Sequence, residues 1–220
     1  MVAELISVGT EILLGNIVNT NAAYLAEKCA LLGLSLYHQS VVGDNEARME
    51  DTIRRALERS DVVILTGGLG PTKDDLTKEV TAKVFKKALC EDAHTKERIM
   101  EFFQKIHNGE KITENNWKQA LIPEGAIIVE NQNGTAPGLI VIGDEGSGYE
   151  GKRAILIPGP PNECIPMFET QIAPYLSDLQ PEGIYSSMVK VCAIGESRAE
   201  TMVADLMDAQ TNPTLAPYAK

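Results

Sequence analysis

Hydrophobic positions change their spacing repeatedly along the chain, and each change marks a new element of secondary structure. Short runs of aliphatic and β-branched residues predict buried strands at residues 5–8, 34–42, 62–66, 126–129, 138–142 and 154–157. Between these runs, apolar residues recur every three or four positions, which is the spacing of an amphipathic helix. This spacing predicts helices at residues 22–32, 49–57, 76–87, 99–106 and 164–176.

The alternation of strands and helices predicts an α/β fold with a mostly parallel sheet and helices on both of its faces. Residues 143–152 are rich in Gly, Ser and acidic side chains and are expected to form a surface hairpin or loop. In such folds, ligands bind at the carboxyl ends of the strands. Candidate functional residues are therefore expected at the point where each strand ends.

A domain boundary is expected near residues 176–183, where the sequence Gln180-Pro181-Glu182-Gly183 favours turns. We assign residues 1–176 to the first domain and residues 183–220 to the start of a second, truncated α+β segment. In the second part, residues 185–194 predict a strand, and apolar residues from Ala199 to Met207 predict a helix. About forty residues are too few for an independent core, so this segment either continues in a longer chain or docks on the first domain.

Composition excludes several classes of function. The net charge is −11 with no compensating basic cluster, which opposes direct binding to nucleic acid. There is no run of about 18 apolar residues that could span a membrane, and no basic, apolar leader opens the sequence. The four cysteines are scattered, without metal-site spacing, as in a protein with reduced thiols. We expect a cytoplasmic protein that contacts neither membranes nor nucleic acid.

The sequence Leu65-Thr66-Gly67-Gly68-Leu69-Gly70-Pro71-Thr72-Lys73-Asp74-Asp75 is the most informative motif. It connects a predicted buried strand to a predicted helix. Glycines at such a junction let backbone N–H groups approach phosphate oxygens, and the helix N-terminus adds a favourable dipole. Asp74 and Asp75 are unsuited to a bare anion site, but they suit a divalent cation bound between them and a phosphate. The motif predicts a magnesium-dependent nucleotide or pyrophosphate site.

Other polar clusters also follow predicted strands, and an α/β sheet gathers such clusters along one edge. Together they offer glycines, carboxylates, amides and one lysine, with no Ser-His-Asp or Cys-His relay. This favours phosphate chemistry through a metal-activated water. Structural roles stay open, because Asn19 and Asp44 have the position of helix caps, and Thr72 and Asp75 have capping-box spacing. Lys118 is equally suited to a surface position. The clusters contain Thr10, Glu11, Asn19, Asp44, Asn115, Lys118, Gly134, Thr135, Pro158 and Gly159.

These motifs, in this order, resemble the N-terminal part of the CinA (competence/damage-inducible protein A) family. That part carries a molybdenum-cofactor-biosynthesis domain similar to MogA and MoeA. The resemblance runs through the whole chain and continues into Gly195-Glu196-Ser197 and Thr211-Asn212-Pro213-Thr214, which look like the family's middle domain, cut off midway. Its matching motifs are residues 6–15, 19–21, 42–45, 66–77, 113–116, 134–138 and 158–161.

The resemblance implies a three-layer α/β/α fold and hydrolysis of ADP-ribose, or a similar nucleoside diphosphate, to AMP and ribose 5-phosphate. The implied cofactor is a divalent cation, Mg, Mn or Co, held by Asp44, Asp74 and Asp75. Glu11 or one of the aspartates would activate the water. The chain lacks the nicotinamide-mononucleotide deamidase domain of longer relatives. The residues implied to contact the substrate are Thr10, Asn19, Thr66, Gly67, Gly68, Gly70, Thr72, Asn115, Lys118, Gly134, Thr135, Pro158 and Gly159.

Two alternatives stay open at this point. The domain could bind a molybdopterin or nucleotide without turning it over, since one fold serves many functions. However, Leu69 stands where molybdopterin-binding relatives have Thr, which weakens the case for a pterin. The protein could instead be an interaction protein in competence or DNA damage, which would require a protein partner. The resemblance also implies a homodimer.

Overall fold

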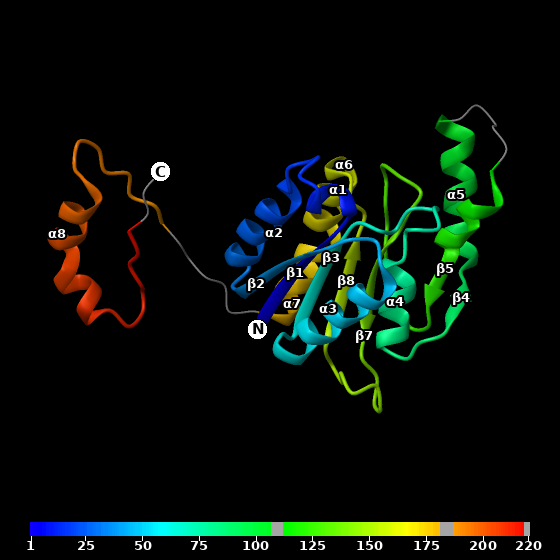
Figure 1. Cartoon of the computed structure of the whole chain (residues 1–220), viewed down its shortest axis with the longest axis horizontal. Helices are drawn as coiled ribbons and strands as arrows, with labels where there is room; N and C mark the ends of the chain where they lie inside the picture. Colours follow the sequence, from blue (N-terminus) through cyan, green and yellow to red (C-terminus); the bar gives the residue numbers. More distant parts are fainter. Residues whose placement is uncertain (107–111, 181–186, 218–220) are drawn as a thin grey trace. The chain divides into compact units, whose positions relative to one another are not determined.

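A six-stranded sheet lies at the centre of the first and larger part of the chain (Figure 1). Its strand order is β2-β1-β3-β8-β7-β6. The first four strands are parallel to one another, and β7 runs antiparallel to both of its neighbours, β8 and β6. This confirms the predicted mostly parallel sheet. The strands are β1 (Val2–Val8), β2 (Ser35–Val42), β3 (Val62–Thr66), β6 (Ile127–Val129), β7 (Gly138–Ile142) and β8 (Arg153–Ile157).

The computed structural model describes residues 1–106, 112–180 and 187–217. Contacts divide the chain into two units, Met1–Ile184 and Tyr185–Lys220. The helices of the first unit are α1 (Thr10–Leu13), α2 (Thr20–Leu31), α3 (Glu46–Arg59), α4 (Thr77–Val84), α5 (Ala93–Ile106), α6 (Pro161–Met167) and α7 (Ala173–Leu179). A single π-helical turn, η2 (Phe168–Ile172), joins α6 to α7.

Two hydrophobic cores lie on opposite faces of the sheet, and alternate residues of β3 enter each one. Val63 and Leu65 pack with α3 and α4, whereas Val62 and Ile64 pack with α2 and the α6–α7 segment. All five residues of β3 are buried. A strand buried on both faces reads as a continuous apolar run, which explains why this strand was predicted with its correct ends. The result is the expected three-layer α/β/α arrangement.

A small second sheet was not predicted. It consists of β4 (Leu89–Glu91) and β5 (Leu121–Pro123), paired antiparallel, and a 3-10 helix, η1 (Glu114–Ala120), precedes β5. Strands of three residues are too short to show a periodic pattern. Residues 143–152 connect the antiparallel strands β7 and β8, in agreement with the hairpin or loop that was predicted there.

The second unit contains the expected helix, α8 (Glu196–Ala209). The strand predicted at residues 185–194 is wrong over its described part, because residues 187–194 form no strand. Val189 is 83% exposed there, and no strand within the described ranges pairs with this segment. An apolar run becomes a strand only where a partner supplies hydrogen bonds. No helix in the described part of the chain is long and apolar enough to cross a membrane.

Candidate functional site

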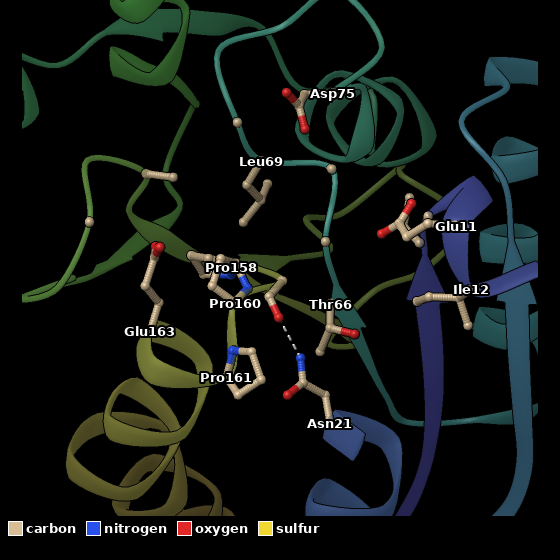
Figure 2. A pocket seen from close by; sticks show the side chains of 18 of the residues that line it. Glu11, Ile12, Asn21, Thr66, Leu69, Asp75, Pro158, Pro160, Pro161 and Glu163 are labelled. Carbon is tan, nitrogen blue, oxygen red and sulfur yellow. Dashed lines mark hydrogen bonds between the residues drawn. The ribbon is translucent and has the colours of Figure 1, made fainter. Parts of the chain in front are cut away.

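A pocket of about 680 Å³ lies at the carboxyl ends of the parallel strands (Figure 2). Val8 ends β1 and Gly9 follows it, Thr66 ends β3, and Pro158 follows β8, and all four residues line the pocket. The sheet thus brings segments far apart in sequence to one edge, as predicted for this fold. Thirteen of the sequence-predicted site residues line the pocket: Glu11, Asn19, Asp44, Thr66, Gly67, Gly68, Gly70, Asp74, Asp75, Gly134, Thr135, Pro158 and Gly159.

The glycine loop after β3 requires glycine for space. A Cβ atom on Gly67 would lie 2.3 Å from the Val8 carbonyl oxygen, and one on Gly68 would lie 2.2 Å from Thr77 Oγ1. Both residues also have positive φ angles, of 96° and 66°. The N–H of Gly67 donates to the Ile157 carbonyl at 3.0 Å, so it is not free for a ligand. Within the described residues, the N–H groups of Gly68 and Gly70 have no recorded acceptor.

The end of the loop is closed by its own side chains. Asp75 accepts a hydrogen bond from the backbone N–H of Thr72 at 2.9 Å. The hydroxyl of Thr72 contacts the carboxylates of both Asp74 and Asp75. The hydrogen bond from the Thr72 hydroxyl to Asp74, together with one from Asp74's own backbone N–H, lowers the pKa of Asp74. The bond that capping-box spacing predicted is present, but it closes a loop, because α4 begins two residues later at Thr77.

A third carboxylate belongs to Asp44, at the end of β2. One oxygen of Asp44 accepts hydrogen bonds from the Thr10 hydroxyl at 2.7 Å and from the Thr10 backbone N–H at 3.0 Å. Thr10 itself does not line the pocket. It orients Asp44, which lines it. The carboxylate of Glu11 lies over Gly9, where a Cβ atom would come within 2.5 Å of Glu11 Oε1.

Three more predicted residues lie outside the lining: Thr72, Asn115 and Lys118. Lys118 donates to the backbone carbonyls of Thr72, at 3.0 Å, and of Asp75. Its ammonium therefore holds the glycine loop against η1. Asn115 is exposed and contacts the Thr113 hydroxyl. In this structure, the three residues shape or flank the loop without lining the cavity.

The first turns of α2 and α6 both contribute lining residues, whereas α4 contributes none. The favourable dipole expected from the helix after the glycine loop stays a prediction, since α4 begins at Thr77, two residues beyond the lining residue Asp75. Asn19 caps α2 by accepting from the N–H of Ala22 at 3.2 Å, and its amide donates to Ser7 Oγ at 2.8 Å. Asn21 donates to the Gly159 carbonyl at 2.7 Å. These two amides tie α2 to β1 and to the segment after β8.

The structure adds one carboxylate that sequence reasoning missed. Glu163, in the first turn of α6, lines the pocket, and its Oε2 accepts a hydrogen bond from Asn131 Nδ2 at 2.7 Å. A Cβ atom on Gly134 would lie 2.2 Å from this oxygen. Burial raises the pKa of Glu163. In the sequence, Glu163 has the position of an ordinary acidic residue at the start of a helix. The one sequence signal for a site residue is its position two residues beyond Pro160-Pro161, in the segment that follows a predicted strand.

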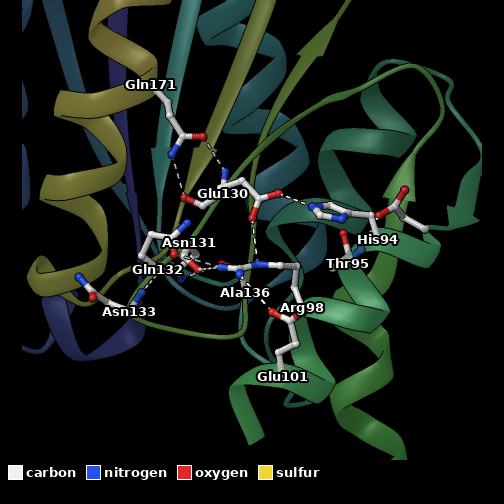
Figure 3. Close-up of polar contacts among 11 residues, drawn as sticks. His94, Thr95, Arg98, Glu101, Glu130, Asn131, Gln132, Asn133, Ala136 and Gln171 are labelled. Atoms are coloured by element: carbon white, nitrogen blue, oxygen red, sulfur yellow. Dashed lines mark hydrogen bonds and ion pairs between the residues drawn. The ribbon is translucent and has the colours of Figure 1, made fainter. Parts of the chain in front are cut away.

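A polar network holds Asn131 in place (Figure 3). Arg98 on α5 donates to the Asn131 carbonyl at 3.3 Å and pairs with Glu130 at 3.1 Å. The backbone of Glu130 exchanges two hydrogen bonds of 2.8 Å with the amide of Gln171. The Asn131 amide also donates to the Ala136 carbonyl at 2.8 Å. The loop from Glu130 to Ala136 is thus fixed from both sides.

The donor chemistry of the pocket suits a divalent cation, because Glu11, Asp44, Asp74 and Asp75 supply hard oxygen ligands. However, within the described residues no three His, Cys, Asp or Glu side chains form a ready metal cluster. Asp44 and Asp75 each have an oxygen engaged by a threonine. The site therefore has the ligand types for Mg²⁺ but not a preassembled cage, as is common where phosphates complete the coordination.

Both parts of the chain match known protein families. Residues 4–178 match the family described as a probable molybdopterin binding domain, and residues 186–220 match the damage-inducible protein CinA KH domain. A CinA-like protein of Dictyoglomus turgidum is 52% identical over 220 residues, which are 100% of this chain and 52% of that protein. A Clostridium beijerinckii protein named as competence-damage inducible is 50% identical over the same span. The chain spans about half the length of these curated relatives.

Solved structures show the same fold. The protein CinA from Thermoplasma acidophilum is 37% identical with a TM-score of 0.66, over 78% of this chain and 95% of that one. The tungsten cofactor synthesizing protein MoaB from Pyrococcus furiosus has a TM-score of 0.51 at 17% identity, over 82% and 95% of the two chains. The second likeness supports the fold alone.

Proposed function

The chain belongs to the CinA family, with a molybdopterin-binding-type domain followed by a CinA KH segment, and we propose that its first domain hydrolyses the pyrophosphate bond of a nucleoside diphosphate such as ADP-ribose with a divalent cation. The products would be AMP and ribose 5-phosphate. The family is shown by these matches, whereas the reaction is a proposal that the resemblance suggests and the residues of the pocket support.

One observation carries the proposal: a glycine loop and four carboxylates line the same pocket. Gly68 and Gly70 face Glu11, Asp44, Asp74 and Asp75 within a cavity of about 680 Å³. This volume lies within the usual range for sites that enclose small molecules and cofactors, and it is larger than a single phosphate requires. Acidic side chains repel a phosphate unless a cation lies between them. The combination thus favours a metal-bound nucleotide over a bare anion.

Each residue has a role that its contacts support. Asp74 and Asp44 would hold the cation. Asp75 is less available to the cation, because it accepts the hydrogen bond from the Thr72 backbone N–H that closes the loop. A bound divalent cation would neutralise charge on the pyrophosphate and favour formation of the attacking hydroxide. The N–H groups of Gly68 and Gly70 would donate to phosphate oxygens. Glu11 would orient the attacking water and accept its proton.

A screen of metals against substrates tests the proposal. ADP-ribose, ADP and other nucleoside diphosphates are incubated with Mg²⁺, Mn²⁺ or Co²⁺, and AMP is measured. We expect metal-dependent AMP release from ADP-ribose, lost in Asp74→Asn and in Asp44→Asn. Asp51→Asn is the matched control, since Asp51 is an exposed α3 residue paired with Arg55. Undiminished metal-dependent turnover in Asp74→Asn would contradict the assignment.

The second candidate is a module that binds a pterin or nucleotide without turnover, and the match to a probable molybdopterin binding domain favours it. Leu69 argues against a pterin, because this apolar side chain lines the pocket and is only 8% exposed. A thermal shift with a pterin but no product from any nucleotide would favour this candidate. The names of the relatives suggest a role in competence or DNA damage. For this chain, the charge of −11 favours a protein partner over DNA in such a role.

A further inference from the structure

Glu163 is the one pocket carboxylate that the proposed hydrolysis does not use. It lies on α6, whereas Glu11 belongs to α1 and Asp44, Asp74 and Asp75 belong to the loops that follow β2 and β3. In Figure 2, Glu163 and Glu11 stand on opposite sides of the pocket, with Leu69 and Pro158 between them. A cation held by the aspartates would therefore not be shared with Glu163, which needs a different partner.

The surroundings of Glu163 have the features of a prepared acceptor. Asn131 Nδ2 donates to Oε2 at 2.7 Å, and within the described residues it is the only side chain recorded as a donor to this carboxylate. Asn131 is itself 7% exposed and held by the Arg98 network. Gly134 leaves space for the carboxylate, since a Cβ atom would lie 2.2 Å from Oε2. One oxygen is thus fixed, and among the described residues the other has no protein donor.

A half-buried carboxylate without enough donors is unfavourable, and this raises the pKa of Glu163. A ligand that supplies hydroxyl or amine donors would remove that penalty. A ribose cis-diol offers two O–H donors on adjacent carbons, which match the free lone pairs of a carboxylate. The amino group of adenine offers a weaker match, because ring nitrogens that are acceptors flank it and would face the same carboxylate.

We propose that Glu163, oriented by Asn131, binds the cis-diol of the nucleotide's ribose and makes the pocket selective for ribonucleotides over deoxyribonucleotides. The inference rests on the proposed nucleotide site and extends it to the sugar. Glu163 is then a specificity residue at one side of the pocket, while the glycine loop and the aspartates bind the pyrophosphate at the other.

Binding without turnover tests this separately from hydrolysis. Titration calorimetry in Mg²⁺ compares ADP, 2′-deoxy-ADP, 3′-deoxy-ADP and inosine diphosphate, with wild type, Glu163→Gln and Glu169→Gln. Each nucleotide carries a methylene group in place of the oxygen between its phosphates, so that it can bind without being hydrolysed. Gln keeps the size of the side chain and can still accept from Asn131, but it presents an N–H₂ donor to the diol. Glu169 is the matched control on the same helical segment, where it is half exposed and contacts Tyr24 and Lys28.

We expect wild type to bind ADP about tenfold or more tightly than either deoxy analogue, the size of one charge-assisted hydrogen bond. Glu163→Gln should lose more affinity for ADP than for either deoxy analogue, because each analogue has only one of the two hydroxyls that Glu163 binds. Glu169→Gln should behave as wild type. Circular dichroism and melting confirm that both variants fold.

Several results would overturn the inference. Wild type that does not bind ADP, or does not distinguish it from the deoxy analogues, would do so. An equal loss for all four ligands in Glu163→Gln would also do so. A loss in Glu163→Gln that is equal for ADP and both deoxy analogues but absent for inosine diphosphate would assign Glu163 to the base. Ribose selectivity without ADP-ribose hydrolysis would reject the proposed function and retain this inference. Hydrolysis with no ribose selectivity would do the reverse.

Discussion

Lys78 and Lys118 hold each other's segments in place. The ammonium of Lys78, on α4, donates to the backbone carbonyl of Lys118 at 2.5 Å. Lys118, on η1, donates in turn to the carbonyls of Thr72 and Asp75, directly before α4. The two lysines therefore connect the glycine loop, η1 and α4 by side-chain contacts. Because Asp74 and Asp75 lie within the connected loop, we expect this arrangement to affect the candidate site.

Removing the Lys118 ammonium should loosen the loop without unfolding the domain. In Lys118→Met, two backbone carbonyls lose a charged donor but lie near solvent, so the free energy of unfolding should fall by about 1 kcal/mol. The metal concentration needed for half-maximal turnover should rise. Urea unfolding and metal titration measure both effects. Lys96→Met, which removes a surface lysine paired with Glu91, should change neither, and equal metal dependence in the two variants would contradict the arrangement.

Lys78 should give the protein a distinct pH dependence. Burial lowers the pKa of this lysine to about 8, whereas the unfolded chain has a lysine pKa of about 10.4. Between these values the unfolded state binds more protons, so wild type should gain stability as pH rises from about 8 to 10. Lys78→Met should lack this gain. Urea unfolding midpoints at pH 7, 8, 9 and 10 give the difference in stability between wild type and Lys78→Met. If this difference does not change with pH, the lowered pKa of Lys78 is wrong.

The clash that a side chain at position 68 would cause can be separated from the cost of its positive φ angle. Gly68→Ala places a Cβ atom 2.2 Å from Thr77 Oγ1, at a φ of 66°. Gly148→Ala meets nothing within 4 Å at a φ of 86°. In both variants the left-handed backbone conformation should lower the free energy of unfolding by about 1 kcal/mol. In Gly68→Ala the clash should lower it further and should also weaken ADP binding. Thermal melting and calorimetry measure these effects. Similar losses of stability in both variants would show that the loop relaxes around the clash.

Glu163 and Glu169 should have opposite effects on stability as pH changes. Burial raises the pKa of Glu163, so its contribution to stability is lost as pH rises through that pKa. Glu163→Gln should therefore be more stable than wild type at pH 7 and equal to it near pH 4. Hydrogen bonds from Tyr24 and Lys28 lower the pKa of Glu169.

The Glu169→Gln variant should consequently be less stable than wild type at pH 7, and this deficit should disappear as pH falls below about 4. Thermal melting across pH 4 to 8 compares the three proteins. If both variants shift in the same direction with pH, the assignment of Glu163 as a half-buried acid is wrong.

Much of the fold follows from local pattern. The apolar run at residues 62–66 is bounded by Asp61 and Gly67, so β3 was predicted with its correct ends. Likewise, Met49 and Ile53 recur at helical spacing and lie on the buried face of α3. The run at residues 185–194 looked equally apolar, yet its described part forms no strand. A strand needs a partner far away in the sequence, and the run itself does not contain that information.

For the candidate site too, some features follow from the sequence and others only from the tertiary structure. The sequence by itself determined the glycine loop, the aspartates at the ends of strands and the family, because each depends on residues close together in the chain. Only the tertiary structure showed that Ile157 accepts a hydrogen bond from the N–H of Gly67 and that α2 and α6, but not α4, contribute residues to the pocket lining. It also placed Asn131 against Glu163, 32 residues away. The orientation and burial of a side chain depend on such distant contacts, which sequence spacing does not record.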